Sequence, residues 1–464
     1  MSGASAFISG FKDVFTVSAG GEVTITNPGA LQGEPTDRLA RAAALGTDQE
    51  KEASRWLLRE LCRLSGIHSA SIQGLYDAMG RGEASGFTTP AMNLRGMVYE
   101  VARAAMRAAA KLNAGPLVFE LARSEMGYTF QDPDEYASVI HAAALREGRN
   151  GPLFIQGDHF QIASKKYHAG GETRDAEMAA LADLVTRAVK AGFYNIDIDA
   201  STLVVLERES VMEQQRDNFE RQAELSALVR ECEPEGVTIS VGGEIGEVGK
   251  KNSNPGEFRA FMDGFLEAFK GRGGSKGISK ISIQTGTSHG GMVLPDGSVA
   301  AVSIDFNCLR EISGIARSEY GMAGAVQHGA STLPSEAFSQ FPAHEAAEVH
   351  LATEFQNMML DHREFPAELR KEMYAWLSEN CAGERKKGWT DEQFYYKTRK
   401  KGWGPFKQQV WDLPAATRTT IMKSLEDRFG FLFEQLGIAG MLPTVERFVK
   451  PVEVRHPAPA SLRG

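Results

Sequence analysis

The sequence predicts an α/β fold: a (β/α)8 TIM barrel with helical extensions at both ends. Three observations support this prediction. Short apolar runs alternate with helical runs from residue 86 to about residue 365, which indicates βαβ units and parallel strands. Eight such units fit into about 270 residues, close to the roughly 250 residues of a typical barrel. Residues that carry chemistry follow the expected strand ends, where barrel enzymes hold their sites.

Each barrel strand is expected as a short apolar run that ends at a glycine or a polar residue. Residues 153–156, for example, are predicted to form a buried strand that delivers Gly157-Asp158-His159 at its end. The expected strands cover residues 86–92, 116–121, 153–156, 194–198, 237–241, 280–284, 322–327 and 349–351. The expected helices cover residues 94–112, 134–147, 174–191, 211–232, 257–269 and 306–317.

Two extensions flank the barrel domain, which we place at residues 81–365. Residues 1–80 are predicted to be partly helical, with a strand–turn–strand at residues 15–25 and leucines at helical spacing further on. Residues 366–464 are predicted to be helical, with a loose Pro-rich end from residue 451. Residues 385–389 and 399–403 both read Arg-Lys-Lys-Gly-Trp. We expect these basic and aromatic repeats to be a solvated or packing motif, with contact to a sugar phosphate as the alternative.

Composition excludes several classes of protein. The chain of 464 residues is 42% apolar and 24% charged, which is ordinary for a globular protein. The formal net charge of -9 argues against a nucleic-acid partner. Since no apolar run approaches the roughly 20 residues that span a bilayer, we expect no membrane contact. The N-terminus lacks a basic region followed by an apolar stretch, and the four cysteines form no CxxC pair. We therefore expect a cytoplasmic protein with buried, reduced thiols.

Three histidines predict a metal site. His159, His289 and His328 each follow a different expected strand, and each has a glycine within two positions. Parallel strands bring such residues to the same end of a barrel. Three imidazoles with one open position are typical of catalytic zinc. A lone histidine would more often be structural, but three in this setting favour one catalytic Zn²⁺.

Carboxylates follow the same strand ends. Asp158 precedes a predicted ligand, so its side chain is expected to face differently and to be able to carry a proton. Asp197 and Asp199 alternate along one strand and share a face, where they need a cation or a hydrogen-bond network. Glu244 ends the fifth strand at the same rim. The turns after His289 and His328 are rich in glycine and are able to cradle phosphate.

Taken in order, the motifs Gly-Asp-His, Ile-Asp-x-Ser, Glu-Ile-Gly, Gly-Thr-x-His-Gly and His-Gly-x-Ser resemble the class II, zinc-dependent fructose- and tagatose-bisphosphate aldolases over residues 85–357. The resemblance implies that the three histidines bind zinc and that Asp158 moves the proton of the C4 hydroxyl. It also implies that Asp199 belongs to the active-site network and that Glu244 contacts the metal in an alternative position. The residues expected to bind substrate or its phosphate, with a monovalent cation nearby, are Asn93, Asp197, Gly290, Gly291, Gly329, Ser331 and Thr353.

Three departures from the family pattern concern the substrate. The acidic residues expected on the loop after Glu244 are replaced, and Glu247 is our substitute for the base that takes the proton of the donor ketone. Val293 stands near the place of a phosphate-binding lysine, and His350 replaces an asparagine at the last strand end. These changes leave the predicted metal ligands intact.

The predicted function is reversible aldol cleavage of a phosphorylated ketose, such as fructose 1,6-bisphosphate, to dihydroxyacetone phosphate and an aldehyde. We expect the enzyme to be a homo-oligomer, a dimer or higher. Because the metal accepts the charge, no Schiff-base lysine is required. Two alternatives stay open: a non-catalytic subunit that supports a separate tagatose-bisphosphate aldolase, and a related lyase that acts on another sugar. The three histidines argue against the first alternative.

Overall fold

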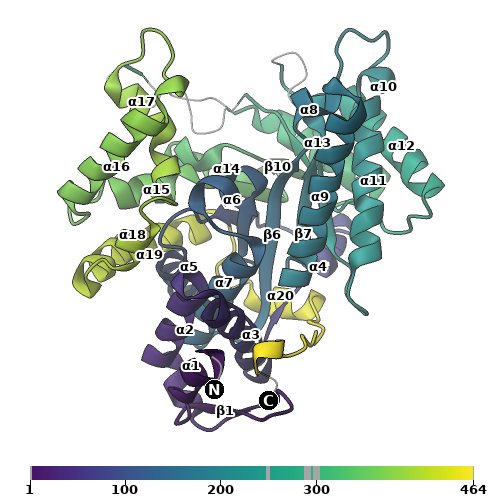
Figure 1. Cartoon of the computed structure of the whole chain (residues 1–464). Helices are drawn as coiled ribbons and strands as arrows, with labels where there is room; N and C mark the ends of the chain where they lie inside the picture. Colours follow the sequence, from purple (N-terminus) through teal and green to yellow (C-terminus); the bar gives the residue numbers. More distant parts are fainter. Residues whose placement is uncertain (1–2, 247–250, 287–293, 296–303, 463–464) are drawn as a thin grey trace.

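The computed structural model describes residues 3–246, 251–286, 294–295 and 304–462, and it contains a closed barrel of eight parallel strands (Figure 1). The strands pair in chain order, and the last returns to the first, so the predicted barrel is confirmed. Their bounds differ from the predicted ones by a few residues. The barrel strands are β4 (Thr89–Asn93), β5 (Val118–Ala122), β6 (Gly151–Gln161), β7 (Asn195–Asp199), β8 (Ser240–Glu244), β9 (Lys280–Ile283), β10 (Ala325–Gln327) and β11 (Glu348–Leu351).

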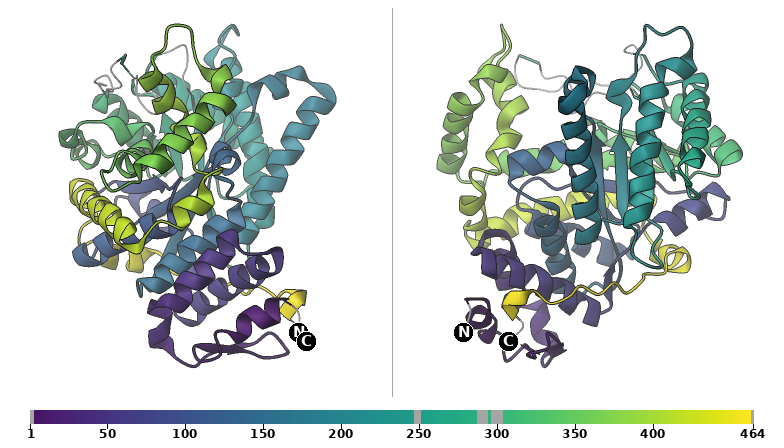
Figure 2. Two further views of the ribbon diagram at one scale, coloured as in Figure 1. Left: turned by 60° about the vertical axis from the view of Figure 1, so that its left-hand side comes forward. Right: turned by 45° about the vertical axis from the view of Figure 1, so that its right-hand side comes forward.

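Helices surround this barrel, and further helices from the chain ends cover its lower half and one flank (Figures 1 and 2). The predicted helix over residues 211–232 is divided in two at Gln215, and the short helices α6, α8 and α14 were not predicted. The helices are α1 (Gly3–Ser9), α2 (Glu34–Leu45), α3 (Asp48–Leu64), α4 (Gln73–Gly80), α5 (Val98–Leu112), α6 (Arg123–Thr129), α7 (Pro133–Arg146), α8 (Ser164–Ala169), α9 (Gly171–Ala191), α10 (Val211–Gln214), α11 (Arg216–Cys232), α12 (Pro255–Gly271), α13 (Phe306–Tyr320), α14 (Gln340–Ala343), α15 (Thr353–Leu360), α16 (Ala367–Asn380), α17 (Asp391–Thr398), α18 (Lys407–Trp411), α19 (Ala415–Gln435) and α20 (Leu442–Phe448).

Local sequence explains where the barrel helices begin and end. Helix α12 starts at a capping box, in which the Asn254 side chain accepts a hydrogen bond from the Glu257 backbone N–H and Glu257 bonds back. Helix α9 ends at Gly192, which adopts a left-handed φ of 96° that favours glycine. Among the described residues, no helix is long and apolar enough to cross a membrane.

The N-terminal residues contribute to the barrel as well as to the surface. Strands β1 (Phe15–Val17) and β2 (Val23–Ile25) form the predicted hairpin. A further short strand, β3 (Ile67–Ser69), pairs in parallel with the start of β6. One continuous apolar core includes Leu57 before the barrel, Ile155 inside it and Phe429 after it.

The C-terminal residues fold back onto the barrel. Helix α19 packs along α5, and Trp403 lies against Gly96, where a Cβ would stand 2.3 Å from the indole ring. The Pro-rich end, which was expected to be loose, lies against α3, because the indole N–H of Trp56 donates to the carbonyl of His456 at 3.0 Å. Both termini are at the bottom of the molecule, opposite the carboxyl ends of the barrel strands (Figure 1).

His141 on α7 makes stability depend on pH. The residue is buried, Nδ1 lies 2.7 Å from the carbonyl of Ala137, and burial lowers the pKa of its imidazole to about 4. As the pH falls from about 6.5 to 4, the unfolded chain takes up a proton that the folded chain does not, so the free energy of unfolding should fall by up to about 3 kcal/mol. The His141→Gln variant should reduce this slope in urea unfolding followed at several pH values, while His456, whose pKa burial also lowers to about 4, keeps its own share. The exposed His168→Gln variant should keep the full slope, and an unchanged slope in His141→Gln would contradict the prediction.

Candidate active site

The bulged end of β6 sets the position of Asp158 and His159. The pairing of β6 with β7 shifts register between Gly157 and Phe160. A Cβ at Gly157 would stand 2.4 Å from the Phe160 ring, so only glycine allows this bend. His159 has a φ of 40°, an uncommon backbone conformation for a residue with a side chain. Such conformations concentrate at functional sites.

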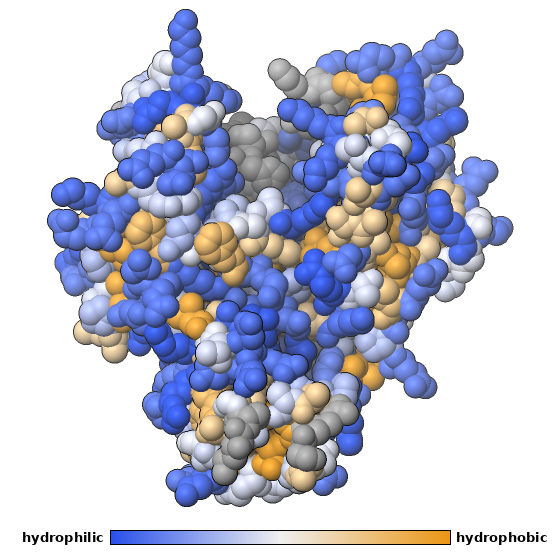
Figure 3. Space-filling view, in the orientation of Figure 1, coloured by the Kyte–Doolittle hydropathy of each residue, from blue (hydrophilic) through white to orange (hydrophobic). Residues whose placement is uncertain are grey.

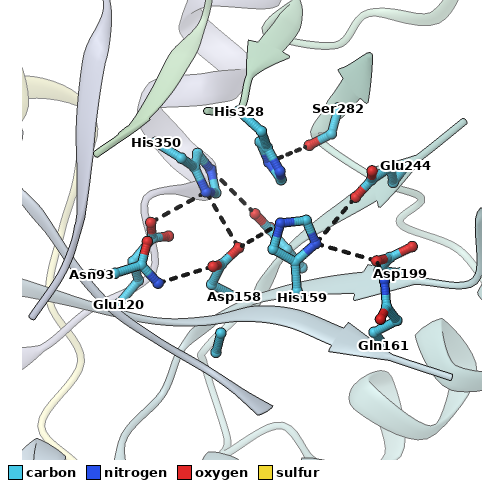
Figure 4. A network of polar contacts seen from close by, with 12 residues as sticks. Asn93, Glu120, Asp158, His159, Gln161, Asp199, Glu244, Ser282, His328 and His350 are labelled. Atoms are coloured by element: carbon cyan, nitrogen blue, oxygen red, sulfur yellow. Dashed lines mark hydrogen bonds and ion pairs between the residues drawn. The ribbon is translucent and has the colours of Figure 1, made fainter. Parts of the chain in front are cut away.

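Two carboxylates orient the His159 ring (Figure 4). Nδ1 lies 3.2 Å from Oδ2 of Asp199 and 3.3 Å from Oε2 of Glu244. Nε2 therefore faces the other way, toward Oδ1 of Asp158 at 3.8 Å. Burial lowers the pKa of His159, but Asp158 and Glu244 outweigh burial and hold that pKa well above its ordinary value.

His328, at the end of β10, meets His159 edge to face with ring centroids 4.3 Å apart. Its Nε2 lies 3.0 Å from the hydroxyl of Ser282 on β9. Asp158, His159 and His328 each offer one ligand atom, and these three atoms lie within 4.8 Å of one another. A second such group consists of His159, Asp199 and Glu244. Two imidazoles and a carboxylate suit zinc, and a carboxylate on the far nitrogen of a ligand histidine is common in zinc sites.

The described residues thus bring together two of the three histidines predicted to bind zinc. His289 lies outside the described residues, and so do Gly290, Gly291 and the predicted base Glu247. The residues present at the strand ends fit a zinc ion.

Asp158 is buried among hydrogen-bond donors and cations. Its Oδ2 accepts a hydrogen bond of 2.9 Å from the side-chain amide of Asn93 on β4, and its Oδ1 lies 3.3 Å from Nδ1 of His350. Burial raises the pKa of Asp158, but His159 and His350 outweigh burial and hold that pKa well below its ordinary value. The carboxylate is therefore ionised and able to accept a proton. Asn93 also donates to Glu125, which is held by Arg95.

His350 on β11 is central to the site, although the sequence placed it outside the metal group. Its ring stacks on His328 with centroids 4.1 Å apart. Its Nε2 donates to Oε1 of Glu348 at 2.6 Å, and its Nδ1 lies 3.2 Å from Oε1 of Glu120. Burial raises the pKa of Glu120 to about 8. The sequence signal was available: polar residues interrupt the apolar strands β5 and β11.

Below these residues, the barrel interior contains a buried lysine. Nζ of Lys280 is bonded to Glu348 and lies 2.9 Å from Oδ2 of Asp197. Gly242 makes room for this pair, since a Cβ there would stand 2.3 Å from Asp197. Asp197, predicted to bind substrate, therefore lies against Lys280 inside the barrel and does not line the cavity described next.

A cavity of about 670 Å³ opens above Asp158, His159 and His328. In the space-filling view the top of the molecule is hollowed between two mostly hydrophilic lobes, one with α16 and α17 and the other with α8 to α12 (Figure 3). The remaining predicted substrate-binding residues that the structure describes line it: Asn93, Gly329, Ser331 and Thr353. Gly329 has a φ of 70°, and the Ser331 hydroxyl accepts a hydrogen bond from the Ala352 N–H at 2.6 Å.

The two Arg-Lys-Lys-Gly-Trp repeats have different environments. In the first, the Arg385 guanidinium pairs with Asp391 at 2.7 Å and lies over Phe394, which is a packing role. In the second, Arg399 pairs with Asp361 at 2.8 Å, but Lys400 lines the cavity with its ammonium 5.4 Å from the Tyr128 ring centroid. Burial, and then the nearby Arg95, lower the pKa of Lys400. The second repeat thus reaches the cavity from its own chain.

Comparisons with known proteins identify the family of this chain. The profile of the family "Fructose-bisphosphate aldolase class-II" matches residues 75–401. No curated protein matches the chain. Among solved structures, a probable tagatose 6 phosphate kinase from Sinorhizobium meliloti 1021 is 17% identical, with a TM-score of 0.55 over 75% of this chain and 97% of that chain. This likeness shows a shared fold.

Two solved aldolases are also similar. The YdjI aldolase from Escherichia coli K12 is 13% identical, with a TM-score of 0.46 over 81% of this chain and 99% of that chain. A fructose-bisphosphate aldolase from Campylobacter jejuni is 17% identical, with a TM-score of 0.48 over 81% of this chain and 97% of that chain.

Proposed function

Because the chain belongs to the class II fructose-bisphosphate aldolase family, we propose that it is a zinc-dependent lyase that reversibly cleaves a phosphorylated ketose to dihydroxyacetone phosphate and an aldehyde. One observation carries the proposal. Asp158, His159 and His328 come from two different strands and converge at the floor of one cavity. Zinc bound there supplies a Lewis acid for the negative charge that forms when the carbon–carbon bond breaks.

The chain's own residues then have separate roles. Asp158 accepts the proton of the C4 hydroxyl during cleavage and returns it during synthesis. Asn93 holds the carboxylate in place through its 2.9 Å hydrogen bond to Oδ2. Asp199 and Glu244 fix the orientation of His159. Glu247 keeps its proposed role as the base for the donor ketone.

The ends of the cavity suit an anionic substrate. Gly329, Ser331 and Thr353 lie on one side, where backbone N–H groups and hydroxyls are able to bind a phosphate. Lys400 lies in the same cavity and, among the described residues, forms no ion pair. The Tyr128 ring lies beside this half-buried ammonium, and an anion bound there would offset more of the cost of its burial. We assign Lys400 to a charged group of the substrate.

Replacing Asp158 with asparagine should lower the rate of cleavage by at least about 100-fold, the usual contribution of a positioned acid–base group. Asparagine has the same shape and keeps an oxygen that can accept from Asn93, so the fold should not change. The measurement is kcat for triose phosphate release, together with the zinc content at the histidines. Undiminished cleavage by a correctly folded Asp158→Asn protein would remove Asp158 from this role.

The Lys400→Met variant should raise KM by about tenfold or more, because a hydrogen bond to a charged group is worth about 1.5–3 kcal/mol. kcat should change less, since Lys400 does not belong to the groups that could hold the metal. Lys386→Met is the matched control, because Lys386 occupies the equivalent position in the exposed first repeat. Equal KM values for the two variants would contradict the assignment of Lys400.

The activity itself is tested by incubating the zinc-loaded protein with a panel of ketose mono- and bisphosphates. Release of dihydroxyacetone phosphate from at least one of them, lost after chelation and restored by zinc, is the expected result. Absence of release from every ketose phosphate, with zinc bound, would disprove the proposal and favour a non-catalytic role.

A further inference from the structure

We infer that Glu120, Asp158 and His350 form a second binding site for a divalent cation, next to the proposed zinc site. The three residues lie near the ends of strands β5, β6 and β11, of which β5 and β6 are adjacent while β4 separates β5 from β11. One ligand atom from each lies within 4.8 Å of the others. The inference shares Asp158 with the proposed function and otherwise stands on separate residues.

Three buried atoms point at the same spot without a hydrogen bond. They are Oε1 of Glu120, Oδ1 of Asp158 and Nδ1 of His350, and none has a hydrogen-bond partner among the described residues. The side chains are at most 6% exposed, and each of the three atoms is itself buried. Leaving three polar atoms buried and unsatisfied would cost several kcal/mol in total. A bound cation removes that cost.

The distances match those between ligands of one ion. Nδ1 of His350 lies 3.2 Å from Oε1 of Glu120 and 3.3 Å from Oδ1 of Asp158. Ligands about 2.1 Å from a tetrahedral or octahedral ion lie about 3.0–3.4 Å from one another. Neither oxygen satisfies the geometry of a hydrogen bond from a ring N–H. Two ligands of one ion lie at this distance from each other. The carboxylate oxygens lie off the direction of the ring lone pair because the ion itself occupies that direction.

The other nitrogen of His350 is already committed. Nε2 lies 2.6 Å from Oε1 of Glu348, which is in turn bonded to Lys280 and to the hydroxyl of Tyr76. With its proton on Nε2, the ring presents the Nδ1 lone pair to the two carboxylates. A histidine that donates one N–H to a carboxylate while its other nitrogen binds metal is the usual arrangement in metal sites. Two carboxylate oxygens facing Nδ1 need a positive charge there, which is either a proton on Nδ1 or the bound cation that we infer.

The charges of the groups around His350 also favour a bound cation. Four buried carboxylates surround His350, those of Glu120, Asp158, Asp197 and Glu348. Lys280 is the lysine that pairs with two of them. One nitrogen and two oxygens suit a borderline divalent ion such as Zn²⁺, Mn²⁺ or Co²⁺ better than Ca²⁺ or Mg²⁺. Asp158 and His350 both line the cavity, so solvent can complete the coordination.

Metal stoichiometry tests the inference without any substrate. The full-length protein is stripped with a chelator, titrated with Zn²⁺, desalted and analysed for bound metal. We expect two equivalents in the wild-type protein and one in His350→Gln, whose amide is able to replace the hydrogen bond to Glu348. Glu120→Gln should weaken the second equivalent by about 100-fold or more. His159→Gln should lose the other equivalent, and the exposed His168→Gln should keep both.

The results separate this inference from the proposed function. One equivalent in the wild-type protein, or a second equivalent that survives His350→Gln, would overturn the cation site and would indicate a protonated imidazole between the two carboxylates. If His350→Gln fails to fold by circular dichroism, Glu120→Gln decides the question with the same measurement. An active aldolase with one bound ion would leave the proposed function standing, whereas two bound ions without aldol cleavage would leave the cation site standing.

Discussion

Replacing His159 with alanine is expected to remove zinc from the proposed site and to lower kcat/KM for cleavage by about 10³-fold or more. The size follows from the several kcal/mol that a Lewis acid contributes to a transition state with developing charge. His159 lies at the centre of the site, with Asp158, Asp199, Glu244 and His328 around its ring. Removing it therefore takes away a proposed zinc ligand and breaks the contacts that hold the two candidate ligand groups together.

Two controls make this result specific. His159→Asn tests for backbone strain, because asparagine tolerates the positive φ of 40° better than alanine does. His168→Ala, on the exposed end of α8, should keep both zinc and activity. Zinc content by mass spectrometry and triose phosphate release are measured on the same preparations. Full activity with undiminished zinc in either His159 variant would exclude His159 as a ligand.

The barrel was predictable because its signals are local. Alternation of apolar strands and helices, such as the run 153–156 followed by the helical run from 174, is written in neighbouring residues. The strand-end rule also predicted that Asp158 and His159 face a site, since Gly157-Asp158-His159 follows an apolar run, and both residues line the cavity. Strand bounds were less predictable. Strand β6 continues to Gln161 because the bulge after Gly157 lets the chain rejoin β7, and a bulge has no clear sequence signal.

The interior of the site was not predictable, for a physical reason. A charged residue in each of three short barrel strands, Glu120, Lys280 and Glu348, indicates a polar interior but does not show which charges pair. Closing the barrel brings the three together from strands far apart in sequence. His350 was underrated for the same reason, since its partners Glu120 and Asp158 are some 190 or more residues away. Contacts between residues so far apart in the sequence arise when the sheet closes, and the spacing of neighbouring residues does not predict them.

Lys400 shows how an extension becomes part of a site. Its repeat looked like a solvated basic face, and the first copy at residues 385–389 lies at the surface. In the second copy, Trp403 packs against Gly96 and the Gly404 N–H donates to the carbonyl of Tyr128 at 3.0 Å. These contacts fix the segment on α6 and place Lys400 in the cavity. Identical motifs therefore differ in role because of what each one packs against.

Replacing Lys280 with methionine should lower the free energy of unfolding by about 3–5 kcal/mol at neutral pH, the usual cost of removing one partner of a buried ion pair. Lys280 is 1% exposed, and its ammonium is bonded to Glu348, to Asp197 at 2.9 Å and to the Gln156 side chain at 2.9 Å. Burial lowers the pKa of Lys280, but Asp197 and Glu348 outweigh burial and raise that pKa above its ordinary value. Methionine fills the space but leaves two carboxylates buried without their cation.

The loss of stability should come from the unpaired buried charges, and a second substitution tests this explanation. Adding Glu348→Gln to Lys280→Met removes one of the stranded charges, so the double variant should be more stable than Lys280→Met alone. Lys423→Met is the matched surface control, because Lys423 and Asp427 form an exposed pair on α19 and the loss should stay below about 1 kcal/mol. Urea unfolding at pH 7 measures all three variants. A loss below about 1 kcal/mol in Lys280→Met would mean that the interior carboxylates are protonated or hold another cation, and the bound-metal analysis of the same protein distinguishes these two cases.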